Sequence, residues 1–181
     1  MPLHCRAGVV LALVVCLLAP TAPSAAIDRP AFNKYSAARL AQQILALRAA
    51  GRIGIHDYSA NKAADRRDRS LASQQLADIA RGRRVNLSRR CHGGRLIRIR
   101  PDIRILRFLA DYGTRYGGYT INVLFGQCHS PHSLHYRGRA VDLRCGTAVT
   151  RADASAISWG VKRNLETCRS DQHWHYSVGG R

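Results

Sequence analysis

The sequence predicts an α+β domain in which a small antiparallel sheet is flanked by helices. Two observations predict it. The second half of the chain contains short segments with the two-residue period of half-buried strands, such as 119–125 and 173–178. The first half contains longer segments whose apolar residues recur at helical spacing. No repeat or low-complexity stretch interrupts either half.

Four segments combine helical spacing of apolar residues with a start or stop signal. They are 36–50, 70–82, 101–116 and 150–165. Ser36 can cap the first helix, and Pro101 suits the first turn of the third. In the last helix, Ile157 and Val161 are expected to face inward. The polar segment 58–69 is expected to be irregular.

Five segments are predicted to be strands. They are 85–87, 96–99, 119–125, 139–144 and 173–178. The fourth contains Val141-Asp142-Leu143, in which one carboxylate lies between two aliphatic residues. A buried carboxylate is costly unless it is paired or bound to a metal. Asp142 therefore needs a partner.

Histidines that could partner this carboxylate lie on both sides of it in the sequence. His135 precedes Asp142 by seven residues, and His173 and His175 follow in the last predicted strand. Side chains alternate along a strand, so His173 and His175 share one face while Trp174 points to the other. Two imidazoles and one carboxylate are a common ligand set for catalytic zinc, which leaves a fourth position for water.

These residues resemble the motifs of the zinc D-Ala-D-Ala metallopeptidases, which are grouped with lysostaphin-type peptidases and the hedgehog signalling domain. The family's Ser-x-His-x-x-Gly-x-Ala-x-Asp motif matches residues 133–142, and its His-x-His motif matches 173–175. The resemblance extends from about 119 to 181. It implies a hedgehog- and D,D-peptidase-like fold in which His135, Asp142 and His175 bind Zn²⁺. By the same resemblance, His173 is catalytic rather than a ligand.

Two positions depart from the family pattern. Many relatives have Glu or Asp three residues before the last ligand, where this chain has Gln172. Asp171, or Glu166 as the only Glu in the chain, would have to carry the proton instead. Relatives also tend to have an Arg just after the strand that precedes the first motif. Here another arginine, such as Arg137 or Arg139, would have to hold the substrate.

The resemblance implies an exported zinc peptidase that hydrolyses peptidoglycan stem peptides, as a D,D-carboxypeptidase or an endopeptidase. In this interpretation His173 stabilises the tetrahedral oxyanion and Asp171 transfers the proton. The alternative is a non-catalytic zinc-containing module that binds the cell wall or takes part in signalling. Gln172, in place of an acid, is the residue that favours the alternative.

Residues 1–26 have the pattern of a secretory signal peptide, with a positively charged start, an apolar core and a small-residue cleavage site at 24–26. The apolar run is too short for a transmembrane helix, so no membrane anchor is expected after cleavage. We expect a mostly helical region over 27–100 and the zinc peptidase core over 101–181. Together they are expected to form one monomeric domain, secreted, periplasmic or associated with the cell wall.

Four cysteines follow the predicted signal peptide, at positions 91, 128, 145 and 168. An even number in an exported chain indicates two disulfides, for which three pairings exist. A four-cysteine zinc site is the competing interpretation, but no Cys-x-x-Cys pair is present. Among the disulfide pairings we favour Cys91–Cys128 and Cys145–Cys168.

The chain is strongly basic, with a formal net charge of +18. A basic surface favours an anionic partner, and for an exported protein the nearest candidates are the acidic polymers of the cell wall. A nucleic-acid partner is not expected, because the chain has an export signal and neither a helix-turn-helix pattern nor an aromatic stacking platform.

Overall fold

The computed structural model describes residues 34–164, 168 and 173–179. All of them belong to one compact unit, 32–181. The predicted signal peptide 1–26 lies outside the described residues, as do Glu166, Asp171 and Gln172. Within the described part of the chain, no helix is long and apolar enough to cross a membrane.

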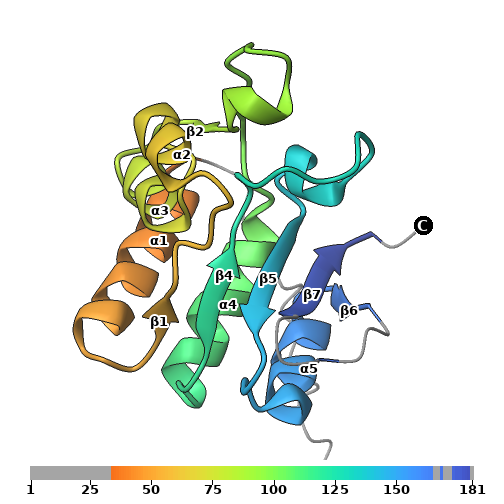
Figure 1. The fold of residues 1–181 in the computed structure, drawn as a ribbon. Coiled ribbons are helices and arrows are strands. Elements are labelled where there is room, and N and C mark those ends of the chain that lie inside the picture. The colour runs from red at the N-terminus through yellow and green to blue at the C-terminus, as the bar shows by residue number, and fades with distance from the viewer. Residues whose placement is uncertain (1–33, 165–167, 169–172, 180–181) are drawn as a thin grey trace, which may run out of the picture. The chain divides into compact units, whose positions relative to one another are not determined.

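A five-stranded sheet forms the centre of this unit (Figure 1). In spatial order its strands are β1 (Gly54–Ile55), β4 (Thr120–Val123), β5 (Ala140–Arg144), β7 (His173–Val178) and β6 (Val161–Arg163). A separate antiparallel pair joins β2 (Val85–Asn86) to β3 (Arg98–Ile99). The α+β prediction is confirmed in this general form.

The main sheet is mixed, so the prediction of a wholly antiparallel sheet is wrong at one edge. Strand β1 pairs with β4 in parallel, whereas the other three pairings are antiparallel. Parallel neighbours need a long crossover connection. Here the connection runs from 56 to 119 and includes three α-helices.

Five α-helices accompany the sheet in the described residues: α1 (Lys34–Ala49), α2 (Lys62–Asp68), α3 (Ala72–Ala80), α4 (Ile103–Arg115) and α5 (Val149–Ser158). Two short 3₁₀ helices, η1 (Arg89–Cys91) and η2 (Leu134–Arg137), lie in loops. Helix α4 lies behind the sheet and packs against α1, α5, β6 and β7, while α1 also packs against α3 (Figure 1). One face of the sheet therefore belongs to the core.

Helix α4 supplies much of that core. Its fully buried members are Ile105, Leu106, Phe108, Leu109 and Tyr112. Their spacing gives one continuous apolar face, as the sequence predicted. The helix is capped by Asp102, whose carboxylate accepts from the Arg104 N–H. Pro101 therefore precedes the cap and is not in the first turn.

Helix α2 falls inside the segment that was predicted to be irregular. Asn61 caps it by accepting from the Ala64 N–H. Its two buried residues are Asp65 and Asp68, not apolar side chains. The apolar period that predicts a helix is therefore missing from the sequence.

The predicted helix 150–165 is also corrected by the structure. Helix α5 ends at Ser158, and Gly160 follows with φ +66°. This left-handed conformation, which glycine adopts without strain, ends the helix. Val161 is buried as predicted, but in strand β6, whereas Ile157 is 73% exposed instead of facing inward.

Both predicted disulfides are present. Cys91 is bonded to Cys128 with a Cα–Cα distance of 5.0 Å, and Cys145 to Cys168 with 5.7 Å. The first joins η1 to the loop that follows β4. The second joins the end of β5 to the segment that precedes β7.

Candidate metal centre

The pairing of β5 with β7 brings a carboxylate and a histidine face to face. Asp142 lies directly opposite His175 in the register, and the next pair on the same sheet face is Arg144 and His173. Directly opposed side chains in an antiparallel pair have Cβ atoms about 5 Å apart. Trp174 points to the other face, as predicted, and packs there against the core.

His135 reaches the same sheet face from the loop between β4 and β5. It lies in η2, where the Ser133 side chain caps the helix by accepting from the His135 N–H. The residue after η2, Gly138, has φ +68°. A Cβ at Gly138 would lie 2.6 Å from the carbonyl oxygen of Arg100, so glycine is required both by conformation and by space.

The donor atoms of the three predicted ligands converge. The Nε2 atom of His135 lies 3.2 Å from Oδ1 of Asp142 and 3.2 Å from Nδ1 of His175. The third separation, between His175 Nδ1 and Asp142 Oδ1, is 2.9 Å. Three ligands bound at about 2.0–2.1 Å to a tetrahedral ion would be about 3.3 Å apart, which is close to these three values.

The protonation state of His135 also fits a metal ligand. Its Nδ1 lies 2.8 Å from the carbonyl oxygen of Leu124, which can only accept, so Nδ1 carries the proton. In the neutral ring Nε2 then has a free lone pair, and it faces the carboxylate of Asp142. Two facing acceptors need a cation between them, either a proton or a metal ion. Metal-binding histidines commonly have such a second hydrogen bond.

The carboxylate itself is held in its ionised form. When a proton instead of a metal ion lies between these groups, burial still raises the pKa of Asp142, but the charge and hydrogen bond of His135 and the hydrogen bond of His175 outweigh burial. The pKa of Asp142 is therefore well below its ordinary value, and the side chain is 1% exposed. A buried anion among imidazoles is the environment in which a cation binds.

His173 approaches the same carboxylate from the solvent side. Its Nε2 lies 3.4 Å from Oδ2 of Asp142, and its side chain is 38% exposed, against 15% for His175. His173 is thus close to the centre yet accessible from outside. Asp142, His173 and His175 form one group of side chains that could hold a metal ion.

A second such group contains His129, a histidine that lies outside the two family motifs. The His129 ring stacks parallel on that of His135, with ring centroids 4.0 Å apart, and forms a possible metal-binding group with His135 and Asp142. Burial, and then the neighbouring His135, lowers the pKa of His129 to about 4. The only sequence signal was the three-residue spacing of histidines at 129, 132 and 135.

Tyr136 fixes the position of His129. Its hydroxyl accepts from the His129 N–H at 2.6 Å and donates to the His129 carbonyl oxygen at 3.0 Å. The Tyr136 ring also packs edge-on against His92. Tyr136 therefore stabilises the loop beside the centre.

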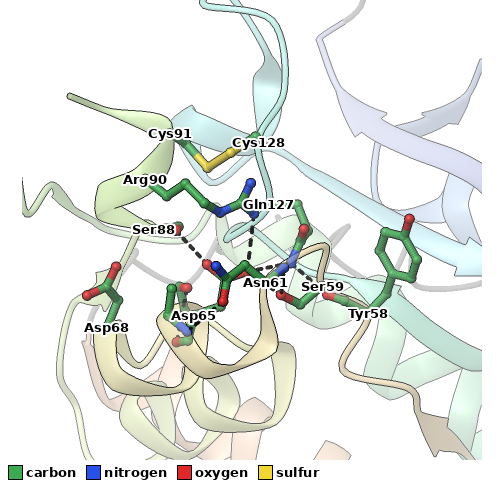
Figure 2. A network of polar contacts seen from close by, with 12 residues as sticks. Tyr58, Ser59, Asn61, Asp65, Asp68, Ser88, Arg90, Cys91, Gln127 and Cys128 are labelled. Carbon is green, nitrogen blue, oxygen red and sulfur yellow. Dashed lines mark hydrogen bonds and ion pairs between the residues drawn. A yellow bond between two sulfur atoms is a disulfide. The ribbon is translucent and has the colours of Figure 1, made fainter. Parts of the chain in front are cut away.

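A buried polar network anchors the same loop to α2 (Figure 2). Asp65 is fully buried and accepts from the hydroxyls of Ser59 and Ser88, each at 2.5 Å. Gln127, two residues before His129, donates to Asp65 at 3.2 Å and to the Tyr58 carbonyl oxygen at 2.6 Å.

Burial raises the pKa of Asp65, but the hydrogen bonds from these hydroxyls and the charge of Arg90 lower it by a larger amount. The net pKa is therefore below the ordinary value. The neighbouring Cys128 is tied to Cys91 in η1. The polar network and the disulfide thus connect this loop to two elements, α2 through Gln127 and η1 through Cys128.

The remaining predicted site residues divide into two groups. Arg137 is exposed on η2, and Arg139 is half-buried next to Gly179. Asp171 and Glu166 lie outside the described residues.

Comparison with known proteins gave no match to any protein family, curated protein or solved structure.

Proposed function

We propose that this chain is a zinc-dependent peptidase that hydrolyses peptidoglycan stem peptides, as a D,D-carboxypeptidase or an endopeptidase. The observation that carries the proposal is the convergence of His135, Asp142 and His175, with an exposed histidine beside them. Three protein ligands with an accessible side are typical of a catalytic metal site, whereas structural zinc sites are usually closed by four protein ligands.

The donor set fits zinc. Two imidazole nitrogens and one carboxylate oxygen are its usual ligands at catalytic sites, and a bound zinc ion would polarise a scissile carbonyl and activate a water molecule. The register of β5 and β7 holds two of the ligands rigidly opposite each other. The third ligand, His135, is oriented by the hydrogen bond from its Nδ1 to the Leu124 carbonyl oxygen.

In this proposal His173 acts on the substrate. Because it is part-exposed and close to Asp142, its ring can donate a hydrogen bond to an oxygen that gains negative charge during peptide hydrolysis. In the same scheme Asp171 takes the proton of the attacking water and passes it to the leaving amine, and Glu166 is the other candidate for this role. An arginine, Arg137 or Arg139, would bind the peptide carboxylate.

The proposed location is outside the cytoplasm, in the periplasm or at the cell wall. The two disulfides support it, because disulfides persist in oxidising compartments. The signal-like pattern of residues 1–26 supports it from the sequence. The hedgehog- and D,D-peptidase-like fold family belongs to the same proposal and is supported by the motif order alone.

A non-catalytic zinc module that binds the wall or takes part in signalling is the second candidate. Gln172 favours it, because an acid is expected at this position in an active enzyme. Among the residues described around the centre, Asp142 is the one carboxylate, and it is itself a proposed ligand.

One experiment separates the two candidates. The purified mature chain would be analysed for bound metal and then incubated with defined muropeptides before and after removal of metal by a chelator. The peptidase proposal predicts about one zinc per chain and product formation that stops on chelation and returns with Zn²⁺. Zinc binding without cleavage of any muropeptide would favour the non-catalytic module. An Asp171→Asn variant, with Glu166→Gln as its counterpart, would identify the proton carrier.

A further inference from the structure

Two adjoining hollows lie on the surface formed by α2, η1 and the β2–β3 pair. The larger, about 590 Å³, includes Arg67, Arg69, Arg89 and Arg90 in its lining. The smaller, about 390 Å³, includes Arg69, Arg83, Arg84 and Arg98. Arg69 and Asn86 line both hollows, so the two hollows adjoin, and we call their combined lining the arginine track.

The arginine track has a large excess of positive charge. Its lining contains seven arginines and two aspartates, Asp68 and Asp78. Among the described residues, Arg67, Arg84 and Arg98 make no ion pair, and all three are exposed. Their charges are free to bind an anion from solution.

The other four arginines lie within ion-pair distance of buried carboxylates, most closely Arg69. Arg69 makes two hydrogen bonds to Asp78, at 3.0 and 2.8 Å. Arg90 lies 3.5 Å from fully buried Asp65, beside the Cys91–Cys128 disulfide (Figure 2). Restrained guanidinium groups lose less conformational entropy on binding than mobile ones do. The track therefore combines fixed and free cations.

The lining of the track indicates the chemistry of its ligand. Guanidinium groups match phosphate oxygens with paired hydrogen bonds. No aromatic side chain lines either hollow, so the stacking surface that single-stranded nucleic acids require is missing from this described surface. Because the two hollows adjoin, they suit a ligand whose phosphate groups repeat along a chain.

We propose that the arginine track binds a polymer of polyols linked by phosphodiesters, which is the chemistry of one class of anionic cell-wall polymer. The track is joined to the candidate metal centre, because Arg90 precedes Cys91, whose disulfide partner Cys128 precedes His129. Binding there holds the polymer on the loop system that also carries the centre. The proposal does not require the centre to be catalytic.

The test is a titration of the full mature chain with poly(glycerol phosphate). Binding is measured by isothermal titration calorimetry at several salt concentrations. The competitors are poly-glutamate of equal charge and duplex DNA. The track variant is Arg67→Gln with Arg84→Gln and Arg98→Gln. The matched control also removes three exposed charges without described ion pairs, by Arg39→Gln, Arg48→Gln and Lys162→Gln.

The proposal predicts that poly(glycerol phosphate) binds more tightly than either competitor. Loss of three phosphate contacts should weaken its binding about tenfold or more in the track variant, and the slope of log affinity against log salt should flatten by about two. The control variant should change affinity by less than about twofold, and chelation of metal should not change it. Arg84→Gln alone should weaken binding measurably.

Three results would overturn the proposal. Equal binding of poly-glutamate, or equal weakening by the track and control variants, would mean that diffuse charge attracts any polyanion. Tighter binding of DNA would indicate a nucleic-acid partner. Loss of polymer binding on chelation would place the polymer at the metal centre instead of the track.

Discussion

Asp65→Asn removes a negative charge from the centre of the buried network without changing the size of the side chain. Two hydroxyl donors at 2.5 Å then face a neutral amide. A hydrogen bond to a charged group contributes about 1.5–3 kcal/mol and a neutral one about 0.5–1.5 kcal/mol, so each bond loses roughly 1 kcal/mol. The ion pair with Arg90 adds little, because that side chain is one-third exposed. We expect the variant to be destabilised by about 2–3 kcal/mol at pH 7.

This loss should depend on pH in a defined direction. The pKa of Asp65 in the folded protein is below its ordinary value of 3.8. A carboxylate with a lowered pKa stabilises the fold above its unfolded-state pKa, and the contribution disappears as pH falls through the folded-state pKa. The stability difference between wild type and Asp65→Asn should therefore be constant above about pH 5 and shrink below about pH 4.

The assay is urea unfolding of both proteins from pH 3 to pH 7, with zinc affinity measured in parallel. Because Asp65 holds Gln127, two residues before His129, the variant should also bind zinc more weakly than wild type. Asp57→Asn is the matched control, since Asp57 accepts two hydrogen bonds from Ser73 in α3. It should lose stability but keep zinc affinity. A stability difference that does not change with pH, or a larger zinc effect in the control, would contradict the role assigned to Asp65.

Three further predictions concern the loop and the disulfides. Gly138→Ala should destabilise the fold by about 1–3 kcal/mol in urea unfolding, because its Cβ would meet the Arg100 carbonyl oxygen in a left-handed backbone. Wild-type stability in that variant would show that the loop can move aside. Tyr136→Phe removes both hydrogen bonds to the His129 backbone and should cost about 1–3 kcal/mol and raise the hydrogen exchange rate of the His129 amide; an unchanged rate would contradict the anchoring role. Thiol titration of the denatured, unreduced mature chain should find about zero free thiols, whereas two or more would mean that a disulfide is not formed.

Local pattern was sufficient for the two strands that carry Asp142, His173 and His175 and for the core helix α4, but not for η2, which carries His135. Strands β5 and β7 and helix α4 were predicted because their apolar residues follow the period of their own backbone, which neighbouring residues alone reveal. The same alternation placed His173 and His175 on one sheet face. The register that sets Asp142 opposite His175 follows from which strands pair, and the structure supplies it.

The features that sequence reasoning missed depend on distant partners. Helix α2 buries Asp65, whose partner Ser88 is 23 residues away, so no apolar period marks the helix. His129 reaches His135 because the Cys91–Cys128 disulfide and Tyr136 fold its loop back. The parallel edge strand β1 depends on a crossover of about sixty residues. None of these contacts leaves a periodic signal in the local sequence.

His175 is proposed to bind the metal and His173 to act on the substrate, although they lie two residues apart. Bound zinc and muropeptide cleavage would be measured on purified His175→Ala and His173→Ala. Loss of His175 should reduce zinc binding and activity together, because one of three protein ligands is gone. Loss of His173 should leave zinc bound while activity falls by about 10²–10³, the usual effect of removing one oxyanion donor. If the two variants behave alike in both measurements, or His173→Ala keeps full activity, the assignment is contradicted.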